Sequence, residues 1–265
     1  MCGIRTYDMA STKLEEPDAR RLHAQDIRPI RYGSRLRLGM LLPSSNLAAE
    51  PDLAALLPLG CSVHTTRLKL AGSSHQELLA MTEKVEEAAL LLKDAALDLI
   101  VFHCTGVSTL DPEMGDRLTA RIEAATGIPA MSTAHALIEA FQALEAKWIV
   151  LVSPYPEAVN DSETRFLEHF GVTVVKALGL GKTSGPSMIA VEPAEWYAHA
   201  IANRRADADA YFLSCTTIRA LPIIAALERD IGRPVVTSNQ AMVWHCLRKS
   251  GVQDRLEGFG RLFSH

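Results

Sequence analysis

The sequence repeats itself at a fixed spacing, which restricts the chain to folds built from two similar halves. Two apolar runs that each end at a proline, residues 37–43 and 148–154, lie 111 positions apart. Gly60 and Gly171, which open the next apolar run of each half, are separated by the same 111 positions. Agreement at several points predicts a duplication, with one copy in each of two lobes.

The same spacing relates two cysteines. Residues 98–105 read Asp-Leu-Ile-Val-Phe-His-Cys-Thr and residues 209–216 read Asp-Ala-Tyr-Phe-Leu-Ser-Cys-Thr, so Cys104 and Cys215 hold equivalent places 111 positions apart. Beyond them the offset falls to 105, because the first half carries a longer segment at 106–121. Four pairs keep this second offset: Glu123 and Glu228, Gly127 and Gly232, Pro129 and Pro234, and Ser132 and Thr237.

Each half alternates short apolar runs with amphipathic stretches, the pattern of a parallel sheet with helices on both faces. In the first half a capping-box sequence, Ser74 to Glu77, precedes an apolar stripe of helical period that runs to Ala96. The second half starts the equivalent helix at Pro193, a residue favoured in a first turn. We therefore predict an α/β protein of two pseudo-symmetric lobes, each a four-stranded parallel sheet with helices on both faces.

These patterns also predict the domain organisation. Residues 1–35 are polar, with basic and acidic side chains interspersed, and read as a surface arm that packs on the body or on a partner subunit. Residues 36–146 form lobe 1 and residues 147–238 form lobe 2. The last helix, residues 239–249, is expected to cross back onto lobe 1, so that the C-terminal segment 239–265 joins that lobe.

Composition excludes several classes of function. With 48% hydrophobic residues, 22% charged residues and a net charge of −4, the chain reads as a soluble globular protein without nucleic-acid or membrane partners. Its five cysteines are widely spaced and include no CxxC pair, which predicts free thiols in the reducing cytoplasm rather than a disulfide framework or zinc site. No HExxH, clustered His/Asp set or nucleotide fingerprint occurs, so neither metal nor cofactor is expected.

Cys104 and Cys215 each follow a predicted buried strand. Ligands of open parallel sheets bind beyond the carboxyl ends of the strands, where helix N-termini gather and lower a thiol pKa. The residues that follow the cysteines offer hydroxyl and amide donors for a carboxylate: Thr105, Gly106, Thr216 and Thr217. Two opposed thiols suit racemisation or isomerisation, because one can add to the substrate or remove a proton while the other returns a proton.

The alternative is that these cysteines pack as small apolar residues. We adopt that interpretation for Cys2, Cys61 and Cys246, which lack a matched partner in the repeat. His103 precedes Cys104 on the strand and points to the opposite face, so we predict packing rather than a role as its base.

Several segments resemble the aspartate/glutamate racemase superfamily, and most closely its branch of maleate cis-trans isomerases and arylmalonate decarboxylases. They are Pro43-Ser-Ser-Asn46, Cys104-Thr105-Gly106, Pro154-Tyr155 with Asn160, Cys215-Thr216 and Pro234-Val-Val-Thr-Ser-Asn239. The resemblance implies two flavodoxin-like lobes with the active site in the cleft between them, no cofactor, and a homodimer or higher homo-oligomer.

The same resemblance implies roles for individual residues. Cys104 would be the thiolate that attacks an alkene or abstracts a proton, and Cys215 the opposing proton donor. The substrate carboxylates would be held by Asn46, Thr105, Gly106, Tyr155, Asn160 and Thr216. Maleate isomerases also carry an asparagine in a second-lobe loop, for which residues 183–187 offer no counterpart.

These observations predict a cofactor-independent isomerase of the maleate cis-trans isomerase type, acting on a small mono- or dicarboxylate through a cysteine pair. Decarboxylases of this branch have glycine at the first cysteine position, so the presence of both cysteines favours isomerisation or racemisation. An amino-acid or hydantoin-type racemase using the same cysteines remains an alternative. Two further alternatives are an arylmalonate-type decarboxylase and a non-catalytic ligand-binding protein.

Overall fold

The structure is a computed structural model that describes residues 32–265. The predicted arm, residues 1–35, lies outside the described residues except for its last four. Within the part of the chain described, no helix combines the length and apolar character that crossing a bilayer requires.

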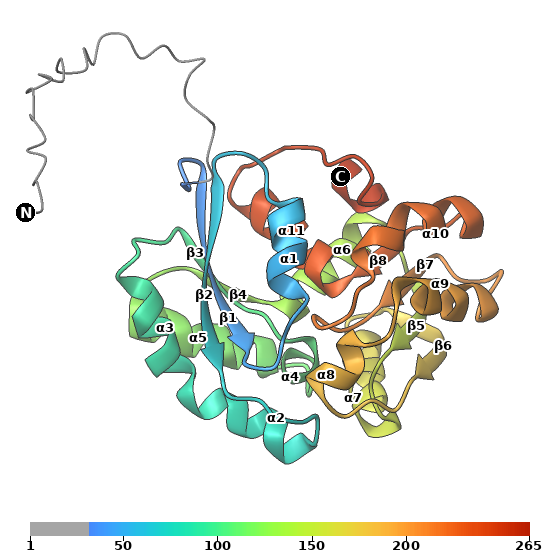
Figure 1. Cartoon of the computed structure of the whole chain (residues 1–265), viewed down its shortest axis with the longest axis horizontal. Helices are drawn as coiled ribbons and strands as arrows, with labels where there is room; N and C mark the ends of the chain where they lie inside the picture. Colours follow the sequence, from blue (N-terminus) through green and yellow to red (C-terminus); the bar gives the residue numbers. More distant parts are fainter. Residues whose placement is uncertain (1–31) are drawn as a thin grey trace, which may run out of the picture. The chain divides into compact units, whose positions relative to one another are not determined.

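Eight strands form two four-stranded sheets with the same strand order. The first sheet has the order β2-β1-β3-β4 and the second β6-β5-β7-β8, and every pairing is parallel. The strands are β1 (Leu36–Pro43), β2 (Cys61–Leu68), β3 (Leu99–Phe102), β4 (Ala130–Ser132), β5 (Trp148–Ser153), β6 (Thr173–Gly179), β7 (Ala210–Leu213) and β8 (Val235–Thr237). Figure 1 shows the two groups of strands in separate halves of the molecule, which confirms the predicted fold class.

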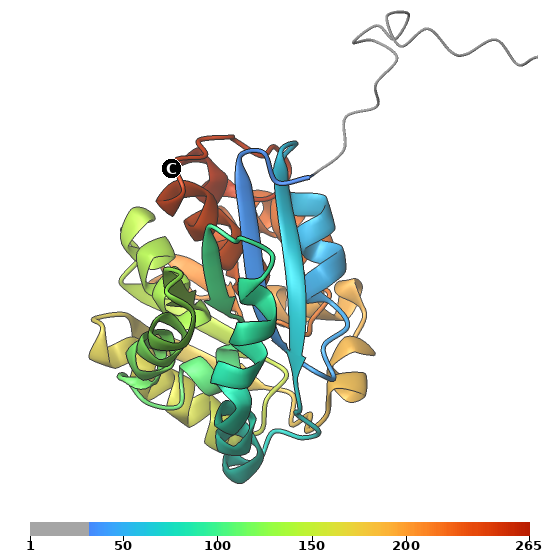
Figure 2. The ribbon, with the colours of Figure 1, turned by 90° about the vertical axis from the view of Figure 1, so that its left-hand side faces the viewer.

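The central strands are apolar because both faces of each sheet are covered. The side chains of β3 and β7 are buried along their whole length, and those of β1 almost so. Figure 2 shows β1 and β2 running side by side with helices in front of them. Buried parallel strands of this kind leave only their carboxyl ends open to loops that carry function.

Eleven α-helices cover the sheets within the described residues. They are α1 (Ala49–Leu56), α2 (His75–Met81), α3 (Val85–Lys93), α4 (Thr105–Ser108), α5 (Met114–Thr126), α6 (Thr133–Ala143), α7 (Glu157–His169), α8 (Gly185–Ile189), α9 (Pro193–Ala202), α10 (Ile224–Ile231) and α11 (Ser238–Lys249). Helices α6 and α11, which follow the last strand of each sheet, pack against each other, and α11 also packs against α1. The boundaries at 146 and 238 stay a prediction that these contacts support.

One predicted helix differs from the structure and another agrees with it. The stripe that follows Ser74 is interrupted by a 3₁₀ turn at Thr82–Lys84, although the capping box is present. The Thr82 carbonyl accepts from the Val85 amide, as in a 3₁₀ turn, and also from the guanidinium of Arg121 over 2.9 Å. The last helix, predicted over residues 239–249, is present as α11 and ends at Lys249 as expected; Gly251 follows with a left-handed φ of 74°.

Candidate active site

Both predicted catalytic cysteines line one cavity between the two lobes. Its volume is about 40 Å³, close to the space of a single water molecule and smaller than a dicarboxylate. The lining residues are Pro43, Ser45, Leu70, Gly72, Ser73, Leu78, Cys104 and Gly106 from the first half, and Tyr155, Thr183, Ser184, Gly185, Met188, Cys215, Thr216 and Thr217 from the second.

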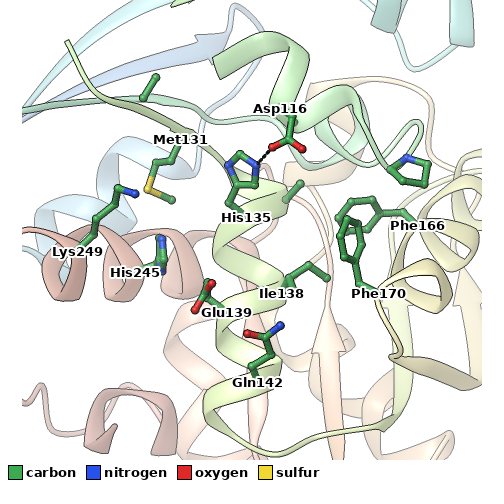
Figure 3. A pocket seen from close by; sticks show the side chains of 14 residues that line it. Asp116, Met131, His135, Ile138, Glu139, Gln142, Phe166, Phe170, His245 and Lys249 are labelled. Carbon is green, nitrogen blue, oxygen red and sulfur yellow. Dashed lines mark hydrogen bonds and ion pairs between the residues drawn. The ribbon is translucent and has the colours of Figure 1, made fainter. Parts of the chain in front are cut away.

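A larger hollow lies elsewhere and contains neither cysteine. It has a volume of about 460 Å³ and is bordered by α6, α7 and α11. Figure 3 shows His135, hydrogen-bonded to Asp116 over 2.8 Å, together with Phe166, Phe170 and other side chains facing this hollow. The paired cysteines, rather than size, identify the smaller cavity as the candidate active site.

Cys104 follows β3 and forms the N-cap of the short helix α4. Its backbone is ordinary and extended, with φ −153° and ψ 107°. Burial raises the pKa of the Cys104 thiol to about 12, against the opposing effect of hydrogen bonds from the amides of Val107 and Gly106. Cys104 is therefore a thiol in this structure. The amides of Val107 and Gly106 already donate to its sulfur and would stabilise the thiolate form.

Cys215 follows β7 and differs from Cys104 in its backbone conformation. Its φ is +101°, a region that non-glycine residues seldom occupy. The amide of Thr217 donates to Cys215 Sγ over 3.3 Å, and Met188 Sδ lies 3.9 Å from the same sulfur. Burial raises the pKa of Cys215 to about 11, while hydrogen bonds from the Tyr155 hydroxyl and the Thr217 amide oppose that rise.

The two thiols influence each other's ionisation. A negative charge on Cys215 raises the pKa of Cys104. Burial, followed by charge on Cys215, Glu163 and Cys104, holds the pKa of Tyr155 well above its usual value, so this phenol remains a neutral hydrogen-bond donor. Like charges in one small site disfavour double ionisation, so the cavity supports one thiolate and one thiol at a time.

Five of the eight predicted site residues line the cavity and three do not. The five are Cys104, Gly106, Tyr155, Cys215 and Thr216. Asn46 instead donates to the carbonyl and hydroxyl oxygens of Thr216, each over 2.9 Å, and its own oxygen accepts from the amides of Ala48 and Ala49.

The other two predicted residues that do not line the cavity are also engaged with protein atoms. The Thr105 hydroxyl donates to Ser238 Oγ over 2.8 Å, and the Asn160 oxygen accepts from the Ser153 hydroxyl. Direct contact of Asn46, Thr105 and Asn160 with substrate stays a prediction; in this structure they hold their neighbours in place.

Sequence reasoning missed four hydroxyl residues that line the cavity: Ser45, Ser73, Thr183 and Ser184. Ser45 lies within the Pro-Ser-Ser-Asn segment, and the two second-half residues lie in the loop where an asparagine was sought. Thr217 was identified only as one of several possible donors. A single-sequence pattern does not distinguish a hydroxyl that faces a cavity from one that faces solvent.

The second-half loop closes directly onto the first half. Ser73 Oγ donates to the Thr183 carbonyl over 3.4 Å. Gly185 approaches so closely that an added Cβ would come within 2.5 Å of the Ser45 carbonyl oxygen. The loop therefore forms one wall of the cavity, and glycine is required at its closest approach.

The cavity is lined by apolar groups together with uncharged polar groups. Among residues 32–265, no Lys, Arg, His, Asp or Glu side chain lines it, and hydroxyls, thiols and backbone amides provide its hydrogen-bonding groups. No group of three or more His, Cys, Asp or Glu side chains in this part of the chain is arranged to hold a metal ion.

His103 lies behind Cys104, as predicted, and does not line the cavity. Its Nε2 lies 2.9 Å from Asn239 Oδ1 and its Nδ1 lies 3.0 Å from Thr133 Oγ1. Burial lowers the pKa of His103 to about 4, so the ring is neutral at physiological pH. It joins the two halves of the molecule through hydrogen bonds and is not positioned as a base for Cys104.

Comparison with known proteins places this geometry in a family. The family model described as arylmalonate decarboxylase matches residues 38–263. A maleate isomerase of Nocardia farcinica is 29% identical over 237 residues, covering 85% of this chain and 94% of the relative. An arylmalonate decarboxylase of Bordetella bronchiseptica is 26% identical over 230 residues, covering 85% of this chain and 95% of the relative.

A solved structure agrees with these sequence matches. The Nocardia farcinica maleate cis-trans isomerase, as a cysteine-to-serine mutant with a covalently bound succinylcysteine intermediate, superposes with a TM-score of 0.82 at 25% identity, covering 86% of this chain and 98% of that one. The chain belongs to the arylmalonate decarboxylase family, within the maleate cis-trans isomerase and arylmalonate decarboxylase branch of the aspartate/glutamate racemase superfamily.

Proposed function

We propose that this protein is a cofactor-independent isomerase that converts maleate, or a closely similar small cis-dicarboxylate, into its trans isomer. The observation that carries the proposal is that one cavity is lined by two cysteines, one from each half of a duplicated chain. Relatives named maleate isomerase and the succinylcysteine in a similar structure support the same chemistry.

In the proposed mechanism, Cys104 is the nucleophile. Its thiolate adds to C2 of maleate, and the electron pair of the C2=C3 bond moves to C3 and into the attached carboxylate as an enediolate-like charge. Cys215, as a thiol, donates its proton to C3. The C2–C3 bond is then single and rotates. Cys215 takes the proton back, the double bond re-forms, and Cys104 leaves as thiolate with fumarate as the product.

Uncharged hydrogen-bond donors in the cavity lining can stabilise the negative charge that develops on the substrate carboxylate. Thr216, Thr217 and Ser45 offer hydroxyls, and the amides that follow both cysteines offer further donors for the developing oxyanion. Because burial keeps both thiols protonated in this structure, Cys104 passes its proton to a carboxylate of the entering maleate dianion, which leaves the thiolate beside a monoanionic substrate; the leaving thiolate takes this proton back at the end of the cycle. In this proposal Asn46 orients Thr216 through its hydrogen bond to the Thr216 hydroxyl. The Tyr155 hydroxyl donates a hydrogen bond to Cys215 and thereby lowers the pKa of that thiol.

Two observations separate this proposal from its alternatives. An amino-acid racemase must recognise an α-ammonium ion, and among the described residues no acidic side chain lines the cavity to do so. Both cysteines are present, whereas decarboxylases of the branch have glycine at the first position. A hydantoin-type racemase remains an outcome of the test below.

The test is proton NMR of maleate in deuterated buffer. Maleate should disappear as fumarate forms, and Cys104→Ala and Cys215→Ala should each lower the rate by about 1,000-fold or more. Cys246→Ala is the matched control: this buried thiol packs against Met131 and Met242, away from the cavity, and its loss should leave the rate within about 3-fold. Deuterium entering the α-carbon of a hydantoin, with maleate untouched, would identify a racemase instead.

Assembly and compartment form part of the same proposal. We expect a homodimer, which sedimentation of the full chain measures. Cys104, Cys215 and Cys246 are free thiols, which supports a reducing, cytoplasmic location.

A further inference from the structure

One buried hydroxyl touches the loops of both cysteines. Ser238 is the first residue of α11 and is fully buried. Its Oγ accepts from the backbone amide of Cys215 over 3.2 Å and from the hydroxyl of Thr105 over 2.8 Å. Thr105 directly follows Cys104, so a single oxygen atom links the two sides of the cavity.

The Cys215 backbone needs such a contact. Among residues 32–265 only Ala96, Glu145 and Cys215 are non-glycine residues with positive φ, and Cys215, at +101°, lies furthest from the ordinary left-handed region. A conformation of this kind persists only where the surroundings hold it. At Cys215 the amide is held by Ser238 and the sulfur by the Thr217 amide.

The first half of the repeat lacks this arrangement. At the repeat offset of 105, the residue equivalent to Ser238 is Thr133, which also begins its helix. The Thr133 hydroxyl contacts His103 and the Phe102 carbonyl, and Cys104 keeps an extended backbone. The strained cysteine and the hydroxyl that holds it are thus features of the second half.

We propose that Ser238 is a positioning residue for the cysteine pair. Its hydroxyl holds Cys215 in the backbone conformation that directs Sγ into the cavity, and through Thr105 it ties this geometry to the loop of Cys104. This inference rests on the proposed function, because it assumes that both sulfurs act on one substrate. A misplacement of about 1 Å at a reacting group lowers a rate by about 100-fold.

The first test is Ser238→Ala in the full chain, with maleate as substrate. We expect kcat to fall by about 10- to 100-fold while KM stays within about 3-fold, because the Ser238 hydroxyl lies behind the cavity wall and does not line it. Ser238→Thr should keep kcat within about 3-fold of the wild type, since threonine retains a hydroxyl on Cβ that can accept from the Cys215 amide and the Thr105 hydroxyl.

The matched control is Thr126→Ala. Thr126 is buried, and its hydroxyl accepts from the Ile128 amide over 3.1 Å and donates to the Ile122 carbonyl over 2.7 Å, at the end of α5 and away from the cavity. This variant loses a comparable buried hydrogen bond, so its melting temperature should fall as in Ser238→Ala while kcat stays unchanged. An equal loss of kcat in both variants, or a normal kcat in folded Ser238→Ala, would overturn the proposal.

A second measurement does not depend on turnover. In a Cys104→Ala background, the alkylation rate of Cys215 by iodoacetamide is followed on its own peptide by mass spectrometry, with and without Ser238→Ala. We expect the rate to change by about 5-fold or more, because the sulfur moves relative to the Thr217 amide and the Tyr155 phenol. An unchanged rate refutes the positioning role. Absence of maleate turnover in the wild-type protein, with a changed alkylation rate, refutes the proposed function alone.

Discussion

Glu163 allows a quantitative prediction about stability and pH. This carboxyl lies on α7, is fully buried, and accepts a hydrogen bond from Ser214 Oγ over 2.6 Å through Oε1. Its Oε2 has no hydrogen-bond partner among the described residues. Burial raises the pKa of Glu163 to about 8, while the Ser214 hydrogen bond opposes that rise.

The direction of the pH effect follows from linkage. Below the unfolded pKa of 4.5, Glu163 is protonated in both the folded and the unfolded chain. Between that value and about pH 8 the unfolded chain loses the proton while the folded chain keeps it, so the free energy of unfolding falls as pH rises. A difference in pKa of this size is worth on the order of 5 kcal/mol once pH 8 is reached, and roughly 2–3 kcal/mol between about pH 5 and pH 7.

Glu163→Gln removes the proton equilibrium and keeps an oxygen for Ser214. We expect the variant to gain stability relative to the wild type by roughly 2–3 kcal/mol as the buffer changes from about pH 5 to about pH 7. Urea unfolding followed by circular dichroism, at four pH values across this range, measures the difference.

A control separates this effect from a general response to neutralising glutamate. Hydrogen bonding to Arg121 lowers the pKa of Glu86, so this side chain is ionised in both states over the same range and Glu86→Gln should shift stability equally at each pH. If the Glu163→Gln difference is also the same at each pH, then Glu163 does not retain its proton in the folded protein and the reasoning is wrong.

Three further substitutions test the cavity. Gly185→Ala places a Cβ against the Ser45 carbonyl, so the loop should move outward, KM for maleate should rise by about 10-fold, and about 1–3 kcal/mol of unfolding free energy should be lost. Tyr155→Phe removes a hydrogen bond that lowers the pKa of Cys215, so alkylation of Cys215 near pH 8 should slow and kcat should fall by about 10-fold or more; unchanged alkylation would contradict the contact. Met188→Ala empties space beside Cys215 Sγ and should raise activity on methyl-substituted maleate relative to maleate by about 5-fold, with about 2–5 kcal/mol lost in unfolding free energy.

The sequence by itself determined the duplication, the parallel α/β architecture and the equivalent places of Cys104 and Cys215. All three follow from the order of apolar and polar residues along the chain. A strand that is buried on both faces needs a continuous run of apolar residues. A residue just after such a run lies at the carboxyl edge of the sheet. The repeat offsets therefore identify equivalent places before any contact is known.

Only the tertiary structure decided which polar side chains face the cavity. Asn46, Thr105 and Asn160 stand in segments that resemble the family, yet each is engaged with protein atoms behind the cavity wall. Ser73 and Thr183, from loops 110 residues apart, meet there instead.

The sequence likewise did not predict the strained backbone of Cys215 or the contact with the Ser238 hydroxyl that holds it. A side chain's direction depends on the backbone angles and on the partners that packing brings to it from the other lobe. The backbone angles and the packing partners of a residue cannot be inferred from its neighbours in the sequence. The hydrogen bonds of Ser238 with Thr105 and Cys215 could therefore be established only from the tertiary structure.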